Sequence, residues 1–481
     1  MKKKLKLNRE RIVSLNDKQK LIINGGSASQ DELALTGSRL IVCGSKKLVH
    51  TPVKVSFVYP FKLFYNLLVY GKATRFYHKP YLFKYLILFF STFILNSFEI
   101  NSQINFEIAK QLDDRVKIVA LGDPTHFEGT INSERIHLIK ELHQQKGFGI
   151  VAFESNLFEV YYGYRKFLAT DNPNPIFQGM YNMLACTEKY ELFEYVKEMN
   201  KKKDSILIIG FETKFSGENT VDNFKDFLKT ELPEIDLSLI NDEVYFEYLK
   251  KLVTKSSYHL KLKNDIQKDY IINHTNKIVN HLEKVEMEAT SKMILTQTLK
   301  NIIADAKRIS LDKHHDINNL RDYEMGKNIS FLKDSLSPIY GKIVLWGSST
   351  HFRKKPNASK YFKNKNIISL GDELNKRYGN EYYFIAYSSY NGKKKRFLWF
   401  DKKLKKPKEE ALEYLATESF NDHAYKDSIY FLSFNSNNPY HLTNMDNKNK
   451  CRIYGHYYDS IIEEDFDALV IVKDTKPYTR L

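Results

Sequence analysis

The chain has 481 residues, of which 42% are hydrophobic and 14% aromatic, and it contains only 3 Cys. A chain of this size and composition can bury a large core, which excludes both an intrinsically disordered protein and a small disulfide-stabilised one. The formal net charge is +16, but residues 1–98 hold 17 Lys and Arg against 4 Asp and Glu, so the remainder is nearly neutral and we expect no nucleic-acid partner.

The first hundred residues do not have the pattern of a folded domain. Residues 33–98 contain no Asp or Glu, and we interpret residues 1–78 as a basic extension. Within residues 79–102, Lys79 and Lys84 precede an uncharged apolar run (85–95) and Ser102 offers a small residue for cleavage, which is the pattern of a secretory signal. The run is shorter than the about 20 residues of a membrane span, so we expect no stable membrane insertion.

Two alternatives for this region stay open. If residues 79–102 act as a signal, the protein is exported and begins near Gln103; otherwise the segment is a buried or interfacial helix of a cytoplasmic protein. The first 26 residues, which end in Gly25-Gly26, resemble the leader of lanthipeptide-type precursors. The alternative to that resemblance is an ordinary basic tail.

Residues 103–481 are predicted to form one α/β domain with three layers and a mostly parallel sheet. Short runs of apolar residues recur along this part of the chain, and such runs are typical of strands that are buried on both faces. The predicted strands are residues 116–121, 149–153, 206–209, 343–346, 382–387 and 468–472. Ser133 and Gly147 bracket a helix between the first two strands, which predicts a βαβ unit with those strands paired. The segment of about residues 220–335 is mostly polar, and its apolar residues have the longer spacing of a helix. This pattern predicts a large helical insertion that packs over the α/β part.

Polar side chains follow four of these strands at the point where each strand ends. The first strand is followed by Asp123 and His126, the second by Glu154, the third by Glu212, and the fourth by Ser348 and His351. Ligands of open parallel sheets bind at the carboxyl ends of the strands, so these side chains are expected to converge on one site.

Hydrolysis by water is the chemistry that this set of side chains suggests. A neutral His with a pKa near 6.5 can accept a proton from water, and a neighbouring carboxylate orients the ring and stabilises the imidazolium. The sequence contains no G-x-S-x-G, G-x-x-x-x-G-K-[ST], G-x-G-x-x-G or C-x-x-C motif, so it does not support a serine hydrolase, a P-loop NTPase, a dinucleotide enzyme or a zinc ribbon.

Seven ordered segments of residues 110–481 resemble the blocks of the erythromycin esterase family. They are Leu121-Gly-Asp-Pro-Thr-His126, residues 147–154, residues 210–212, Arg321-Asp322 to Asn328, residues 343–351, residues 371–374 and residues 466–472. The resemblance implies a three-layer α/β hydrolase in which a His-activated water attacks an ester or lactone carbonyl, without a cofactor.

The resemblance also implies roles for individual residues. His126 would be the general base, Asp123 and Glu154 its acidic partners, Arg135 a structural or oxyanion-side cation, and His351 a second histidine of the site. Four further residues of the matching blocks would bind the substrate, a small-molecule or peptide ester: Arg321, Asp322, Glu212 and Ser348.

This sequence departs from the family pattern within the site itself. Asp123 and Phe127 stand where the family usually has Glu and Gly, and Glu212 stands where Asp is usual. Ser348-Ser349 stand where the antibiotic-inactivating members have His-Asn. Asp is one methylene shorter than Glu, so a contact of the Glu must move by about 1.5 Å or be lost. We therefore expect a divergent branch whose substrate is not a macrolide.

Two other interpretations remain. A metal ion could be held by His126, Glu154 and His351, because two imidazoles and a carboxylate occur in catalytic metal sites. Alternatively, the precursor-like N-terminus and the departures in the site could belong to an accessory protein of peptide maturation with a degraded site. The sequence predicts no oligomeric state.

Overall fold

The protein divides into two compact units, residues 6–103 and residues 104–481 with 1–5. In this computed structural model the described residues are 34–36, 39–41, 105–215, 220–232, 237–257, 265–356, 366–395, 400–415, 429–433, 450–452, 458–459 and 462–481. In the first unit these residues form an antiparallel pair of strands, β1 (Ala34–Thr36) and β2 (Arg39–Ile41). The leader-like and signal-like segments lie outside the described residues, and none of the described helices is long and apolar enough to span a membrane.

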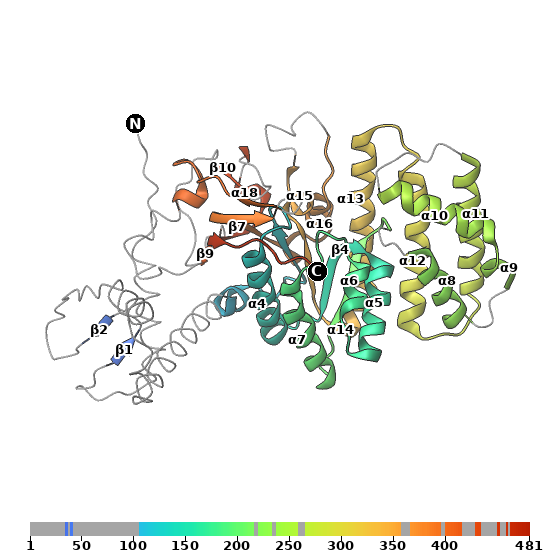
Figure 1. The fold of residues 1–481 in the computed structure, drawn as a ribbon, viewed down its shortest axis with the longest axis horizontal. Helices are drawn as coiled ribbons and strands as arrows, with labels where there is room; N and C mark the ends of the chain where they lie inside the picture. The colour runs from blue at the N-terminus through green and yellow to red at the C-terminus, as the bar shows by residue number, and fades with distance from the viewer. Residues whose placement is uncertain are drawn as a thin grey trace, which may run out of the picture. The chain divides into compact units, whose positions relative to one another are not determined.

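A mostly parallel sheet forms the centre of the larger unit (Figure 1). Its strands follow the order β5-β4-β6-β3-β7-β12-β9, and β8 pairs with the end of β7. Within this sheet, only β9 and β8 among the described strands are antiparallel to their neighbours. The bounds are β3 (Ile118–Asp123), β4 (Ile150–Asn156), β5 (Leu207–Glu212), β6 (Ile343–Ser348), β7 (Tyr382–Lys395), β8 (Asp401–Lys403), β9 (Ile429–Ser433) and β12 (Ala468–Thr475). A separate pair is β10 (Lys450–Cys451) with β11 (Tyr458–Asp459).

The apolar runs of the sequence become the central strands because both of their faces are covered. Every residue of β3, β4 and β5 is buried, and Ile118 to Leu121 have no exposed surface. Such strands expose neither face to water, which is why they lack the alternation of polar and apolar residues that marks a half-exposed strand. The predicted α/β class with a mostly parallel sheet is confirmed.

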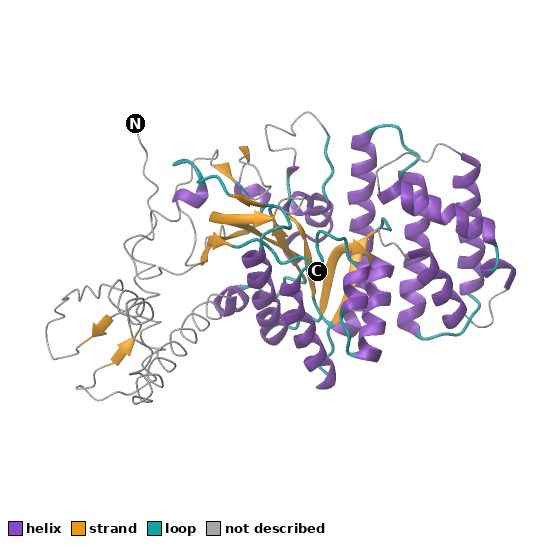
Figure 2. Cartoon of the chain, viewed as in Figure 1, coloured by secondary structure: helices purple, strands orange, loops and turns teal. Residues whose placement is uncertain are grey.

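Helices cover both faces of this sheet (Figure 2). The connections β3–β4 and β4–β5 run in one direction across the sheet, whereas β5–β6 and β6–β7 run in the other. Because such crossovers are right-handed, the helices of the first two connections lie on one face of the sheet and the helices of the other two lie on the opposite face. The first group is α4 (Gly129–Lys146), α5 (Leu157–Thr170), α6 (Asn174–Gly179) and α7 (Tyr190–Lys201); the second includes α13 (His314–Phe331), α14 (Ser337–Tyr340), α15 (Ser349–Phe352) and α16 (Leu370–Tyr378). A short helix, α18 (Ile462–Asp465), precedes β12.

The predicted helical insertion is present between β5 and β6. Its helices are α8 (Thr220–Glu231), α9 (Leu237–Ile240), α10 (Glu243–Ser257), α11 (Asp265–Leu282), α12 (Ala289–Arg308) and α13, which a π-helical turn (Leu332–Leu336) extends. The amide of Asn328 on α13 donates to the carbonyl of Phe211 on β5 at 2.9 Å. This contact anchors the last helix of the insertion beside the carboxyl end of β5.

Two local predictions about the first βαβ unit need correction. The strands β3 and β4 are not neighbours, because β6 lies between them and Ile343 pairs with both Ile118 and Ile150. The helix α4 begins at Gly129 rather than after Ser133, whose hydroxyl instead bonds back to the carbonyl of Gly129 within the first turn. Its predicted end at Gly147 is confirmed, since this residue has the left-handed conformation (φ 70°) that glycine adopts without strain.

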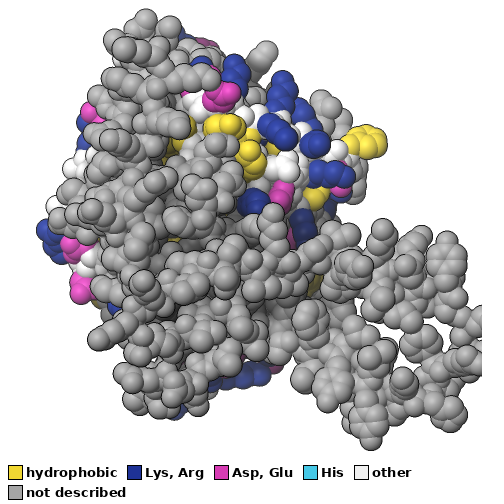
Figure 3. Space-filling model, turned by 90° about the vertical axis from the view of Figure 1, so that its left-hand side faces the viewer, with side chains coloured by type: hydrophobic (Ala, Val, Ile, Leu, Met, Phe, Trp, Pro, Cys, Tyr) yellow, Lys and Arg dark blue, Asp and Glu magenta, His cyan; other side chains and the backbone are white. Residues whose placement is uncertain are grey.

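The surface of the larger unit carries both signs of charge. On the face in Figure 3, dark blue Lys and Arg side chains lie beside magenta Asp and Glu side chains. This mixture fits the near balance of basic and acidic residues after position 98.

We expect Gly210→Ala to destabilise the fold by about 1–3 kcal/mol or more, the usual effect of overpacking. A Cβ on Gly210 in β5 would lie 2.2 Å from the carbonyl oxygen of Ser155 and 2.3 Å from that of Asn156, both backbone atoms of β4. The matched control is Gly326→Ala inside α13, where the nearest atom lies at 3.6 Å and alanine should raise stability by about 0.5–1 kcal/mol. Urea unfolding measures both free energies, and equal effects would contradict the packing argument.

Candidate active site

The turn after β3 presents His126 to the carboxyl edge of the sheet. The backbone N–H of His126 donates to Oδ1 of Asp123 at 2.7 Å, and the same carboxylate lies 2.9 Å from Nδ1 of the imidazole. His126 has φ 64°, the left-handed conformation that a residue other than glycine adopts only where its surroundings enforce it. Asp123 thus fixes the backbone and the ring of His126 together, with 13% of the side chain exposed.

Arg135 holds Asp123 from the inner side of the turn. Its Nη2 lies 2.7 Å from Oδ2 of Asp123, and Nη1 donates to the carbonyl of Leu121 at 3.2 Å. The guanidinium stacks on the ring of Trp346 at 4.0 Å and has no exposed surface. The resemblance implied either a structural or an oxyanion-side role for Arg135. Its complete burial favours the structural role. The shorter side chain of Asp123 still reaches both His126 and Arg135.

Glu154, in the middle of a bulge between β4 and β5, lies between the two histidines of the site. Its Oε2 accepts a hydrogen bond from the backbone N–H of Ser348 at 2.8 Å and lies 3.9 Å from Nε2 of His126. Its Oε1 lies 3.3 Å from Nε2 of His351. Burial alone would raise the pKa of Glu154, but the charge of His351 outweighs it and the pKa lies well below its usual value, so Glu154 stays ionised.

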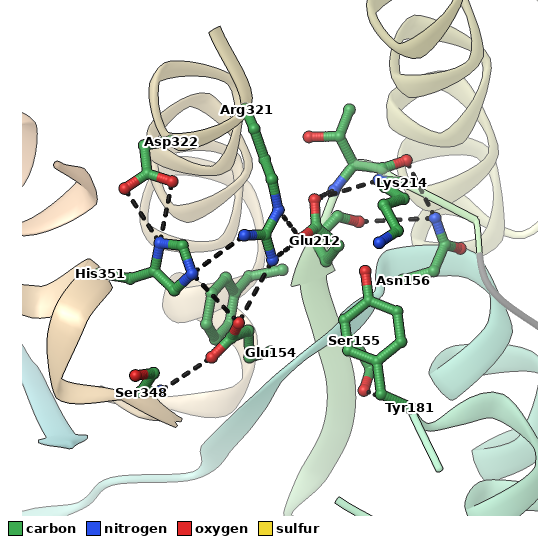
Figure 4. A network of polar contacts seen from close by, with 12 residues as sticks. Glu154, Ser155, Asn156, Tyr181, Glu212, Lys214, Arg321, Asp322, Ser348 and His351 are labelled. Atoms are coloured by element: carbon green, nitrogen blue, oxygen red, sulfur yellow. Dashed lines mark hydrogen bonds and ion pairs between the residues drawn. The ribbon is translucent and has the colours of Figure 1, made fainter. Parts of the chain in front are cut away.

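Arg321 joins the carboxylates of β4 and β5 (Figure 4). From α13, its Nε donates to Oε2 of Glu212 at 2.5 Å, and its Nη2 lies 3.2 Å from Oε1 of Glu154. Glu212 is fully buried, and its Oε1 also accepts the backbone N–H groups of Thr213 and Lys214. Burial would raise the pKa of Glu212, but Arg321 outweighs this effect and lowers it.

His351 lies in α15 and is held by Asp322 of α13. Its Nδ1 lies 2.9 Å from Oδ1 of Asp322, whose Oδ2 also accepts the backbone N–H of Leu370 at 3.1 Å. Nη1 of Arg321 lies 3.0 Å from Nε2 of His351, a contact that only a neutral imidazole can accept. Burial also disfavours the charged ring, yet Asp322 and Glu154 outweigh both effects and raise the pKa of His351 to about 10. At neutral pH this histidine is therefore an imidazolium between two carboxylates.

The electrostatics of His126 differ from those expected for a free histidine. Burial lowers its pKa, but the carboxylate of Asp123, assisted by Glu154, outweighs burial and raises the pKa above 6.5. His126 therefore becomes a neutral base at a higher pH than an unperturbed imidazole does.

The structure brings together all of the residues that the sequence assigned to the site. Ser348 contributes its backbone N–H to Glu154, whereas its hydroxyl caps α15 by accepting the N–H of Thr350. Lys214 and Tyr181 also lie beside this network and were not predicted (Figure 4). Lys214 comes two residues after Glu212, so the rule of strand ends could have found it. No signal in the sequence marks Tyr181.

A metal ion on His126, Glu154 and His351 was the alternative interpretation of these residues. Among the described residues, no group of three or more His, Cys, Asp or Glu side chains is arranged so that it could hold a metal ion. Glu154 bonds instead to the N–H of Ser348 and to Arg321.

Comparison with known proteins identifies the family of this chain. The sequence profile of the erythromycin esterase family matches residues 143–475. This chain belongs to the erythromycin esterase family. The matched range includes Glu154, Glu212, Arg321 and His351 but begins after Asp123 and His126, so the placement of those two rests on the turn described above.

One curated relative shows a distant similarity to this chain. "Putative hydrolase YbfO" of Bacillus subtilis (strain 168) is 24% identical over 292 residues, which cover 57% of this chain. The chain spans 65% of the length of this curated relative. Family membership and this relative both support hydrolase chemistry.

Solved structures share the fold. A succinoglycan biosynthesis protein has a TM-score of 0.59 at 17% identity, over 76% of this chain and 89% of its own. A mutant of the erythromycin esterase EreC in its open conformation has a TM-score of 0.52 at 13% identity, over 77% of this chain and 94% of its own. At these identities the likeness extends to the fold alone.

Proposed function

We propose that this protein hydrolyses an ester or lactone by direct attack of water that His126 deprotonates. The observation that carries the proposal is the orientation of His126, whose Nδ1 is held by Asp123 while Nε2 lies 3.9 Å from Glu154. That distance is too long for a direct hydrogen bond, and no described residue bonds to Nε2. The lone pair of Nε2 is therefore available to a water molecule.

In the proposed reaction, Nε2 of His126 takes a proton from water as the water oxygen attacks the carbonyl carbon. Asp123 keeps the proton of the ring on Nδ1 and stabilises the imidazolium that forms. The ester C–O bond then breaks, and the leaving oxygen takes the proton from Nε2. Arg135 acts only through Asp123, since it has no exposed surface.

His351 and Arg321 contact Glu154 and are suited to stabilise the negative charge that develops on the carbonyl oxygen of the substrate. His351 is an imidazolium at neutral pH and Arg321 is permanently charged, and 16% and 12% of their side chains are exposed. Donors that are already in place stabilise an oxyanion without reorganisation during the reaction. The pKa of Glu154 lies too low for it to act as a proton donor.

The proposed substrate is a small-molecule or peptide ester rather than a macrolide. Ser348 stands where the macrolide-inactivating pattern has a histidine, and its hydroxyl is used to cap α15. A side chain in that role does not supply the imidazole that the family pattern places there.

The test is hydrolysis of a panel of simple esters, lactones and one macrolide by the full chain, with and without a chelator. We expect hydrolysis of the small esters or lactones, unchanged by the chelator. Loss of activity on chelation would contradict direct attack by a water that His126 activates without a metal. Failure on every substrate would favour the accessory role.

A further inference from the structure

Lys214 is a nearly buried cation that has no ion-pair partner among the described residues. It follows β5 beside Glu212 and is only 8% exposed. In the part of the chain that the structure describes, no carboxylate oxygen lies within 4 Å of its ammonium group, and no hydrogen bond of that group is formed. The contact it does make is with the ring of Tyr181, whose centroid lies 5.2 Å from Nζ.

The neighbouring carboxylates already have other partners. Glu212 is bonded to Arg321, and Asp305 on α12 accepts Nε of Arg308 at 2.9 Å. These two arginines raise the positive potential around Lys214. Lys214 therefore has no ion-pair partner of its own among the described residues at this end of the network.

Tyr181 supplies a second unused group at the same place. Its hydroxyl oxygen is buried and has no hydrogen-bond partner among the described residues, although its backbone N–H donates to Ser155. In Figure 4 this hydroxyl and the ammonium of Lys214 point toward one another beside Glu212. Burial, with Glu212 adding to it, holds the pKa of Tyr181 well above its usual value, so the hydroxyl remains a donor.

A nearly buried lysine and a buried hydroxyl that both lack hydrogen-bond partners among the described residues are costly, and an anionic oxygen would satisfy both. We propose that Lys214 and Tyr181 form a binding site for a carboxylate or phosphate group of the substrate. This inference rests on the proposed function, because Arg321 links Glu212 in this site to Glu154 beside His126. The enzyme would then prefer esters that carry a negative charge away from the scissile bond.

The affinity of this site should depend on pH. Burial and the nearby Arg321 lower the pKa of Lys214 to about 8, while Glu212 and Asp305 oppose them in part. The ammonium is charged below that pH and neutral above it. Binding of an anion should therefore weaken as the pH rises through about 8.

Two matched substrates test the proposal: the p-nitrophenyl ester of valeric acid, which is neutral, and the mono-p-nitrophenyl ester of glutaric acid, which carries a carboxylate. The readout is the ratio of kcat/KM for the charged ester to that for the neutral one. We expect Lys214→Met to lower this ratio about tenfold or more, because hydrogen bonds to charged groups are among the stronger ones, and Lys214→Arg to restore much of it. Lys300→Met, an exposed lysine on α12, is the control. A ratio that Lys214→Met leaves unchanged would overturn the proposal.

A binding measurement separates this proposal from the catalytic one. Calorimetry of the full chain with glutarate and with inorganic phosphate distinguishes the two kinds of anion without any hydrolysis. We expect one of them to bind at pH 7, to bind less tightly above pH 8, and to lose affinity in Lys214→Met. Anion binding without ester hydrolysis would remove the proposed function alone. Hydrolysis with no Lys214-dependent binding or preference would remove the anion site alone.

Discussion

Replacement of His126 by alanine should lower kcat/KM for ester hydrolysis by at least about a hundredfold, since general base catalysis contributes about 10²–10⁴ in rate. Of the other groups in the site, Asp123 and Glu154 are ion-paired with Arg135 and Arg321, and the pKa of His351 is raised to about 10. None of them therefore offers a free base to water. Initial rates on a neutral ester measure the effect. The matched control is His315→Ala on the exposed surface of α13, which should retain full activity.

Folding must be separated from catalysis in that experiment. His126 has a left-handed backbone, which asparagine tolerates better than alanine, so His126→Asn should be equally inactive with a smaller loss of stability. A variant that keeps more than about a tenth of the activity would show that another group is the base.

The second large effect is expected on stability, from Arg321→Met. Glu212 is completely buried and Arg321 is its ion-pair partner, so methionine would leave a buried carboxylate without that partner. Breaking a buried ion pair in this way costs about 3–5 kcal/mol. Urea unfolding at pH 7 measures the loss, and Arg165→Met, which breaks the exposed pair with Glu231, should cost less than about 1 kcal/mol.

A double variant tests the cause of this loss. In Arg321→Met with Glu212→Gln the unpaired charge is gone, and the amide oxygen can still accept the N–H groups of Thr213 and Lys214. We expect the double variant to be more stable than Arg321→Met alone. The same stability in both would mean that the pair contributes packing rather than charge compensation.

The sequence predicted those parts of the fold in which burial leaves a pattern within a short segment of the chain. The central strands are continuous apolar runs because helices cover both faces, and four of them end in the polar residues of the site. The rule that parallel strands share their carboxyl edge was enough to bring His126, Glu154 and His351 together.

The features that the sequence did not predict depend on contacts between distant segments. The insertion of β6 between β3 and β4 follows from pairing at Ile343, which no local pattern records. Arg321 and Asp322 entered only through the family resemblance, because a helical pattern does not show which strand end it crosses. Lys214 is unusual because no described residue forms an ion pair with it, and that is a property of the folded site.

The pKa of His126 is the property that tests the central claim most directly. The measurement is the pH dependence of kcat/KM on a neutral ester for the wild type and for Asp123→Asn. Because the carboxylate of Asp123 raises the pKa of His126, the wild-type rate should increase with pH to a midpoint above 6.5, and the midpoint should fall in Asp123→Asn. A rate that does not depend on pH, or a midpoint that Asp123→Asn leaves unchanged, would contradict the assignment of His126 as the base.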